Sequence, residues 1–370
     1  MTIQTEIQRL GWRVLSYAHF SAPRPAILGW FSNHNLGDDA ALYSLNWHFS
    51  NKLAVITPQT YRRIPSNLRL LICGAGGWLN QEAPRHFLKY ITRIKKRSFP
   101  CLFLSGGINR DYVDRNYQRL FPQFKQFLSH FEYIGVRDLM SQRFVEETLG
   151  FKDTRLVPDF VLSLPGEEHL SPPRGNEKTV GLVLATHNET FRHKQKEMYV
   201  YLLAMSDELI SKGYKIICIP FQIDLTSVQS KSVDERQGAM YLKNSLRYPD
   251  QFEVLERMMS PSETLSYIQK NIGVVISMRL HGNVMAARAG VPFISLSYSD
   301  KHAGFLELME MSEFDVALKE EVLDPVKLFD ALKRIEVNYE QVSRHISDKR
   351  SELAGLTQKA VDWIREKYQV

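Results

Sequence analysis

The 370-residue sequence contains little cysteine and no long apolar run. These two shortages argue against a disulfide-stabilised protein and against a membrane-spanning one. Its three cysteines, Cys73, Cys101 and Cys218, each lie inside an apolar run, and no Cys-x-x-Cys spacing occurs. We therefore expect reduced core thiols in a cytoplasmic protein, without a disulfide framework or a structural zinc site. No stretch reaches about 18 apolar residues. The first segment carries Glu6 and Arg9 early, so neither a signal peptide nor a membrane span is expected.

Signals for metals, nucleotides and nucleic acid are also scarce. No cluster of histidine, cysteine and carboxylate residues indicates a metal, and we expect no metal and no other cofactor. The glycine-rich segment 74–77 lacks both the full dinucleotide fingerprint and the Walker lysine. A formal net charge of +6 is too small to indicate nucleic acid, although it suits an anionic substrate or an acidic membrane surface.

Short apolar runs alternate with amphipathic segments, and this alternation predicts an α/β fold with parallel sheets covered on both faces. Segment 165–178 holds three prolines and two glycines and separates two such series. We expect a first lobe at 1–165, a second at 178–338, and a C-terminal helix at 339–370 that packs across both. Two doubly wound lobes of this kind enclose an interlobe cleft.

The individual elements follow from the same pattern. Strands are expected at 26–31, 53–56, 68–73, 101–104, 133–136, 155–157, 179–185, 215–220, 272–277 and 292–297. Helices are expected at 40–49, 84–96, 117–129, 141–149, 197–212, 262–269, 282–289 and 339–368. Residues 222–251 form a polar stretch to which we assign no element.

The first candidate site lies between the strand at 26–31 and the helix at 40–49. Asn35 or Asp38 would serve as the helix N-cap, with Gly37 in the tight turn. Asp39 suits the first helical turn, where the dipole favours a carboxylate. The functional alternative is that Asp38 accepts a hydrogen bond from a substrate hydroxyl or acts as its general base.

Two glycine-rich segments follow strands of the first lobe. Gly74-Ala75-Gly76-Gly77 comes after the strand at 68–73, and Ser105-Gly106-Gly107 comes after the strand at 101–104. Glycines let a backbone approach a ligand or another chain segment closely. We expect both segments to be turns near the cleft, with Gly76 and Gly77 as candidate substrate-binding residues.

The most informative junction is Ser277–Gly282, where a β-branched strand delivers Arg279 and His281 to the start of a helix. One interpretation makes Arg279 a surface charge and His281 a capping residue. However, a guanidinium at the carboxyl end of a strand is costly to desolvate without an anionic partner. Together with the helix N-terminus, the two side chains would form a site for carboxylate and phosphate. Arg137-Asp138 and Lys301 follow other strands of the two lobes. These residues are either surface charges or further residues that bind the anionic substrate.

Three blocks of sequence resemble the polysaccharide pyruvyltransferase family. They are NHNLGDDA, then GVRDLMSQRFVEETLG followed by VPD, and then SMRLHGNVMAARAGVPFISLSYSDKHAGF, in the family's order and spanning residues 33–305. The resemblance implies two Rossmann-like lobes in a GT-B-like arrangement. It also implies phosphoenolpyruvate as donor, a pair of sugar hydroxyls as acceptor and a pyruvate ketal as product. Where many members have an uninterrupted glycine run, this chain has Ala75.

The resemblance associates Arg137, Arg279 and His281 with the donor. We add Lys301, Leu280, Asn35, Gly37, Gly76 and Gly77 to the expected substrate-binding set. His281 is the candidate general acid and Asp38 the candidate base. The donor carries two anionic groups, so its binding requires several cationic side chains: Arg137, Arg279 and Lys301.

Two other functions remain open at this point. A nucleotide-sugar glycosyltransferase of the same two-lobed build would also place Arg and Lys on a phosphate. A non-catalytic protein for an acidic glycan or membrane surface is the other alternative. The basic cluster Arg93, Lys95, Lys96 and Arg97 is either a solvated helix face or a contact that holds the protein at the inner leaflet, near a lipid-linked oligosaccharide acceptor.

Overall fold

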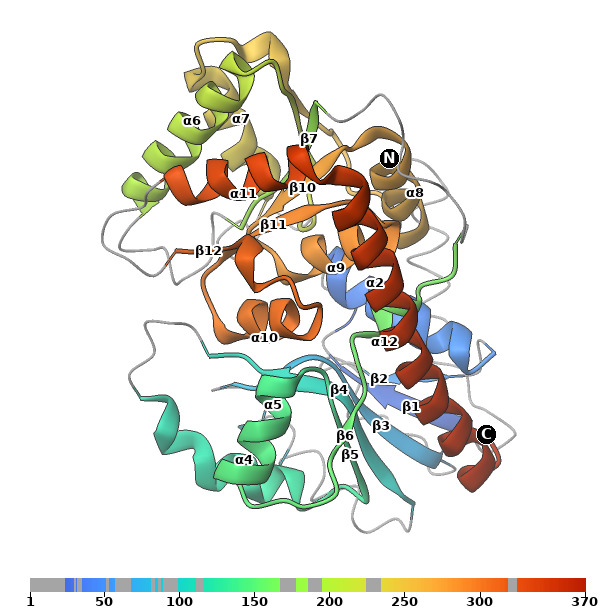
Figure 1. The fold of residues 1–370 in the computed structure, drawn as a ribbon. Coiled ribbons are helices and arrows are strands. Elements are labelled where there is room, and N and C mark those ends of the chain that lie inside the picture. The colour runs from blue at the N-terminus through green and yellow to red at the C-terminus, as the bar shows by residue number, and fades with distance from the viewer. Residues whose placement is uncertain are drawn as a thin grey trace.

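The protein folds into two α/β lobes with a long C-terminal helix alongside both, as the computed structural model shows (Figure 1). The structure describes residues 24–29, 31, 35–50, 53–56, 68–80, 84–85, 88, 99–110, 116–166, 178–185, 195–223, 234–318 and 325–370. The basic cluster at 93–97 and most of the expected linker therefore lie outside the described residues. So does most of the helix expected at 84–96.

The first lobe is built on a six-stranded parallel sheet of order β2-β1-β3-β4-β5-β6. Its strands are β1 (Arg24–Leu28), β2 (Ala54–Ile56), β3 (Leu68–Leu79), β4 (Cys101–Ile108), β5 (Tyr133–Val136) and β6 (Arg155–Leu156). Its helical elements are α2 (Leu36–His48), η2 (Tyr117–Leu120), α4 (Phe121–Leu128), α5 (Leu139–Arg143), the π-helical η3 (Phe144–Thr148) and η4 (Phe160–Ser163). All six strands expected in this lobe are present.

The second lobe has a six-stranded parallel sheet of order β12-β11-β10-β7-β8-β9. Its strands are β7 (Thr179–Val183), β8 (Lys215–Cys218), β9 (Phe252–Val254), β10 (Val274–Ser277), β11 (Phe293–Ser297) and β12 (Asp315–Ala317). Its helical elements are α6 (Gln195–Ser211), α7 (Glu235–Ser245), η6 (Pro249–Gln251), α8 (Pro261–Asn271), α9 (Leu280–Ala289), α10 (Asp300–Leu308), η7 (Ser312–Phe314) and α11 (Val326–Val337). This is the Rossmann strand order, whose ligand crevice lies where the order reverses, between β7 and β10.

Several elements of the structure were not predicted from the sequence, and the turns predicted at the glycine-rich segments are not present. Helix α7 begins within the stretch 222–251 and strand β9 begins just after it. The buried residues of α7 are Glu235, Gly238, Ala239 and Leu242, so its sequence shows little apolar periodicity. The expected glycine turns are wrong, since 74–77 and 105–107 lie inside β3 and β4. There the strands continue through backbone irregularities, with Gly76 paired to Gly106.

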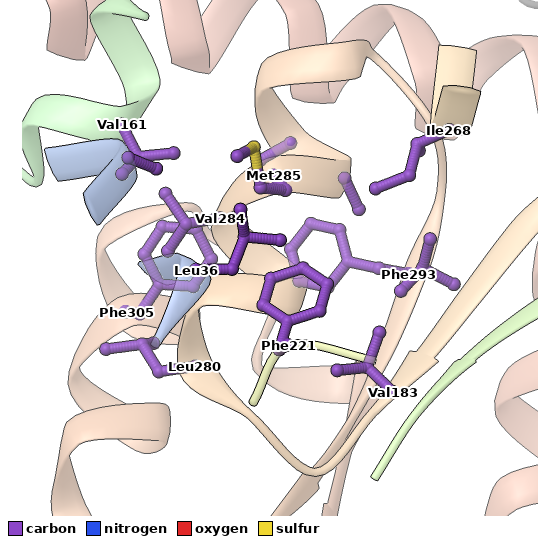
Figure 2. Close-up of a cluster of buried hydrophobic side chains, with 14 of the residues drawn as sticks. Leu36, Val161, Val183, Phe221, Ile268, Leu280, Val284, Met285, Phe293 and Phe305 are labelled. Atoms are coloured by element: carbon purple, nitrogen blue, oxygen red, sulfur yellow. The ribbon is translucent and has the colours of Figure 1, made fainter. Parts of the chain in front are cut away.

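One hydrophobic core extends across both lobes. It joins Leu36 and Val161 of the first lobe to Phe221, Leu280 and Val284 of the second (Figure 2). A separate cluster fills the other face of the first sheet. Helix α2 therefore packs between the lobes, so the residues at its start meet the second lobe.

The C-terminal helix α12 (Tyr339–Tyr368) runs along both lobes (Figure 1). Near its start, the Ser343 hydroxyl donates to the carbonyl of Gly290 in the second lobe at 2.6 Å. Near its end, Trp363 packs against Tyr133 of the first lobe, with ring centroids 4.9 Å apart. Among the described residues, no helix combines the length and the apolar character that crossing a membrane requires.

Candidate functional site

The start of α2 is hydrogen-bonded to the second lobe. The Leu36 amide donates to the carbonyl of Phe221 at 2.8 Å, and Asn35 forms an antiparallel bridge with Gln222. The Asn35 side chain also accepts from the Gly37 amide at 3.1 Å, which makes Asn35 the N-cap of α2. Asp38 is therefore not the cap, and its carboxylate stays available for another role.

Gly37 lies against the imidazole of His281. A Cβ on residue 37 would lie 2.0 Å from Nδ1 of His281, so only glycine fits here without moving the ring. His281 is in the first turn of α9, whose N-cap is Arg279. The interpretation of His281 as the capping residue is therefore wrong.

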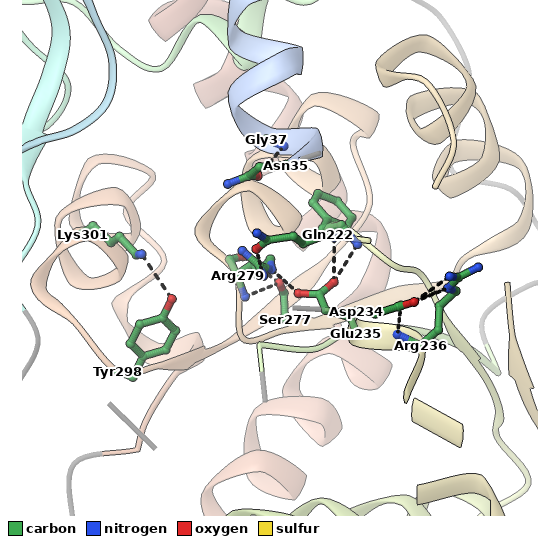
Figure 3. A network of polar contacts seen from close by, with 11 residues as sticks. Asn35, Gly37, Gln222, Asp234, Glu235, Arg236, Ser277, Arg279, Tyr298 and Lys301 are labelled. Carbon is green, nitrogen blue, oxygen red and sulfur yellow. Dashed lines mark hydrogen bonds and ion pairs between the residues drawn. The ribbon is translucent and has the colours of Figure 1, made fainter. Parts of the chain in front are cut away.

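Arg279 is largely buried, with 18% of its side chain exposed. Its Nε donates to the Glu235 carboxylate, and its Nη2 donates to the Gln222 side-chain carbonyl at 2.7 Å (Figure 3). Burial disfavours its charge, but Glu235, Tyr298 and Asp38 outweigh that effect and the pKa of Arg279 is raised. The surface-charge interpretation of Arg279 is thus excluded.

Asp159 is a site residue that the sequence missed. Its Oδ2 lies 3.4 Å from Nε2 of His281, and its Oδ1 accepts from the Val161 amide at 3.0 Å. Burial alone would raise the pKa of this carboxyl, but His281, Arg137 and the Val161 amide together lower it. The anionic Asp159 therefore lies beside the imidazole of His281. The available signal was Val157-Pro158-Asp159, which follows the second motif block after six residues.

Arg137 is almost wholly buried, with 2% exposed. Its Nε lies 3.5 Å from Asp138, whose other oxygen accepts from the Ser141 amide at 2.7 Å and so caps α5. Within the part of the chain that the structure describes, the buried Nη2 of Arg137 has no hydrogen-bond partner. A buried guanidinium nitrogen without a partner is costly, and a bound anion would satisfy it.

Lys301 lies in the first turn of α10, with Nζ 3.2 Å from the Tyr298 hydroxyl and 5.0 Å from the centre of its ring. Across the described ranges it forms no ion pair with a carboxylate. The neighbouring Asp300 is instead paired with Arg110 of the first lobe at 2.6 Å. Lys301 therefore differs from Arg279, Arg137 and His281, each of which has a carboxylate partner.

Asp38 belongs to the same electrostatic cluster. Burial raises the pKa of its carboxyl, while His281, Arg279 and Lys301 act in the opposite direction without cancelling the rise. A carboxyl with a raised pKa holds a proton more readily than an exposed one, which suits a group that accepts a proton from a hydroxyl. The structure thus brings Asp38 of the first lobe to the cations of the second.

The remaining expected residues occupy different surroundings. Gly76, with φ of 137°, is near Asp38, whose Oδ1 would lie 3.9 Å from a Cβ at residue 76. The missing side chain of Gly77 leaves room for Asn109 instead, since a Cβ there would lie 2.6 Å from Cβ of Asn109. Leu280 is buried in the apolar core shared by the lobes (Figure 2).

Buried polar groups under the site support the second-lobe residues. The Asn283 amide donates to the Ser295 hydroxyl at 2.7 Å, and that hydroxyl is 3.2 Å from Nδ1 of His302. Burial, Lys301, Arg137 and His281 hold the pKa of His302 well below its usual value. His302 is therefore neutral and adds no charge. In the described residues, no group of histidine, cysteine and carboxylate side chains is arranged to hold a metal ion.

A family model described as polysaccharide pyruvyl transferase matches residues 31–300, more than half of the 370 residues. The chain belongs to this family. As a pyruvyl transferase it is an enzyme, and its family indicates a polysaccharide acceptor. The matched span contains Asp38, Arg137, Asp159, Glu235 and His281 and ends at Asp300, just before Lys301.

Solved structures with the same fold confirm the GT-B-like arrangement of the pyruvyl transferase. The MnaA–UDP structure from S. aureus is 8% identical, with a TM-score of 0.60, covering 93% of this chain and 96% of that one. A ugt transferase from Siraitia grosvenorii in complex with UDP is 10% identical, with a TM-score of 0.55 and coverage of 94% and 99%. The glycotransferase of kitacinnamycin is 11% identical, with a TM-score of 0.51 and coverage of 94% and 99%. At these identities the likeness shows the fold alone.

Proposed function

We propose that the enzyme transfers pyruvate from phosphoenolpyruvate to two hydroxyls of one sugar in a glycan or lipid-linked oligosaccharide, forming a pyruvate ketal. The observation that carries this proposal is the meeting of Arg137, Arg279, His281 and Lys301 at the boundary of the lobes. The donor has a carboxylate and a phosphate close together, and such a compact dianion suits several converging cations.

The charges at the site favour a donor of this kind. Arg279, Arg137 and His281 each have a carboxylate nearby, which limits the excess of positive charge at the site. Lys301 and the unpartnered Nη2 of Arg137 are then the groups with the most to gain from an anion. Each charge-assisted hydrogen bond contributes ~1.5–3 kcal/mol.

The proposed reaction has two stages. A proton adds to the methylene carbon of phosphoenolpyruvate, positive charge develops at the neighbouring carbon, and a sugar hydroxyl attacks that carbon and loses its proton. A second hydroxyl of the same sugar then displaces inorganic phosphate, and its proton leaves with the phosphate. The products are the ketal and phosphate, with no oxidation or reduction.

The residues divide these tasks. His281, with Asp159 behind it, donates the proton to the methylene carbon. Asp38, on the first-lobe side, accepts the proton of the attacking hydroxyl. Arg137, Arg279 and Lys301 hold the donor. A well-placed acid or base contributes ~10²–10⁴-fold in rate.

A direct assay tests the proposal. The enzyme is incubated with phosphoenolpyruvate and, separately, with UDP-sugars, in the presence of glycans ending in galactose, glucose or N-acetylmannosamine. We expect acceptor-dependent release of phosphate from phosphoenolpyruvate and a pyruvate ketal on one glycan. Sugar transfer from a UDP-sugar, with no phosphate released from phosphoenolpyruvate, would instead identify a glycosyltransferase.

A further inference from the structure

A buried carboxylate outside the expected site residues contacts the donor arginine. We infer that Glu235 is a positioning residue that, with Gln222, aims the Arg279 guanidinium and links it to the start of α2. The kinetic consequence of this inference rests on the proposed function, whereas its structural consequence does not.

Both oxygens of Glu235 are used as acceptors. Oε1 accepts from Nε of Arg279, while Oε2 accepts from the amides of Phe221 at 2.8 Å and Gln222 at 3.0 Å. The side chain is only 1% exposed, and burial raises the pKa of its carboxyl despite the opposing effect of Arg279. Burying such a group is costly unless its partners are fixed, so the arrangement holds Arg279 in one orientation.

The contacts select which edge of the guanidinium faces a ligand. Nε and Nη2, which form its side edge, point to Glu235 and Gln222 (Figure 3). Within the described residues, Nη1 makes no hydrogen bond. A donor anion therefore meets the Nη1 end, and Glu235 determines where that end lies.

The same contacts reach the first lobe. The segment Phe221–Gln222, held by Glu235, accepts from the Leu36 amide and bridges to Asn35. Asp38 lies in the first turn of the helix that Asn35 caps. One carboxylate thus connects Arg279, which holds the donor, with the helix that carries the proposed base.

The key variant is Glu235→Gln, because an amide has one acceptor oxygen where the carboxylate has two. The amide cannot accept from both Arg279 and the two backbone amides, so one set of contacts is lost. We expect KM for phosphoenolpyruvate to rise roughly tenfold or more, as the loss of one charge-assisted hydrogen bond would produce. Glu235→Asp keeps both oxygens and should recover part of this loss.

The matched control is Asp234→Ala, one residue earlier. Asp234 caps α7 and pairs with Arg236, pointing away from Arg279 (Figure 3). This variant should lower the melting temperature, as removal of an N-cap does, while KM stays within about twofold of the wild type. A purely structural role for Glu235 would make the two variants alike in KM, and that result would overturn the inference.

A crystal structure of Glu235→Gln supplies a readout independent of activity. We expect the guanidinium of Arg279, or the Phe221–Gln222 segment, to be displaced from its wild-type position. If both stay in place, the positioning role is wrong whatever the enzyme's substrate. If they move but phosphoenolpyruvate is not a substrate of the wild type, the inference stands and only the proposed function fails.

Discussion

Gly37 and His281 come from different lobes and touch, with a Cβ at residue 37 placed 2.0 Å from Nδ1 of the imidazole. Alanine normally suits a helix better than glycine, so Gly37→Ala would be mild at an open position. Here it must push the imidazole of His281 or the start of α2 away. The contact therefore makes the position of the proposed acid depend on a residue with no side chain.

For Gly37→Ala we expect turnover to fall by about 100-fold, since a displacement of ~1 Å at a reacting group has that effect. Phosphate release from phosphoenolpyruvate with acceptor measures it. Gly355→Ala in α12 is the control, because a Cβ there meets nothing within 4 Å. That variant should gain ~0.5–1 kcal/mol of stability and keep full turnover. Normal turnover in Gly37→Ala would show that the contact is unimportant.

The lowered pKa of Asp159 predicts a pH-dependent contribution to stability. Its anionic form stabilises the fold above the ordinary aspartate pKa of 3.8, and this contribution is lost as pH falls through the lower pKa of the folded state. Asp159→Asn should therefore be less stable than the wild type near about pH 6, and the difference should shrink toward about pH 3. Urea unfolding across this range tests it. A difference that does not change with pH would contradict the assignment.

Lys301 should contribute strongly to donor affinity because, among the described residues, it forms no ion pair with a carboxylate and its Nζ contacts only the Tyr298 hydroxyl and ring. Lys301→Ala is expected to weaken phosphoenolpyruvate binding by roughly tenfold to 100-fold, measured by calorimetry. Lys215→Ala is the control, since Lys215 is a half-exposed residue paired with Glu253 at 2.7 Å. If the two variants bind phosphoenolpyruvate with equal affinity, Lys301 does not contact the donor.

Ala75 adopts a left-handed conformation, with φ of 57°. A residue with a side chain pays ~1–2 kcal/mol to adopt this backbone conformation, and glycine does not. Glycine, however, loses more conformational entropy on folding, which offsets part of the gain. Ala75→Gly should therefore raise the free energy of unfolding by about 0.5–1 kcal/mol. Gly74→Ala should lower it instead, because a Cβ there would lie 1.7 Å from the Leu104 carbonyl oxygen. Denaturant unfolding of both variants checks these opposite signs.

The fold was largely predictable because strands buried on both faces produce conspicuous apolar runs. The site junctions were predictable for a related reason: the carboxyl ends of parallel strands meet at one edge, which brings Arg279 and His281, after β10, near Lys301, after β11. Arg137 and Asp38 were placed by the same reasoning. Whether Arg137 and Asp38 lie close to residues of the second lobe depends on how the two lobes pack. Short-range sequence patterns carry no information about that packing.

Glu235 could not be found from the sequence for a specific reason. It is 44 positions away from Arg279 and lies in a polar stretch, where a glutamate looks like any surface charge. Only the fold turns it inward, at the first turn of α7. The glycine segments were misjudged similarly, because Gly74 permits the close approach of β3 and β4 rather than ending a strand.

The 30-residue helix α12 restricts how the enzyme can open. At ~1.5 Å per residue it is about 45 Å long, and it is attached to a different lobe near each end. A hinge motion that separated the lobes would have to break the Ser343–Gly290 bond or the Trp363–Tyr133 contact. The helix therefore opposes separation of the lobes at both of its ends.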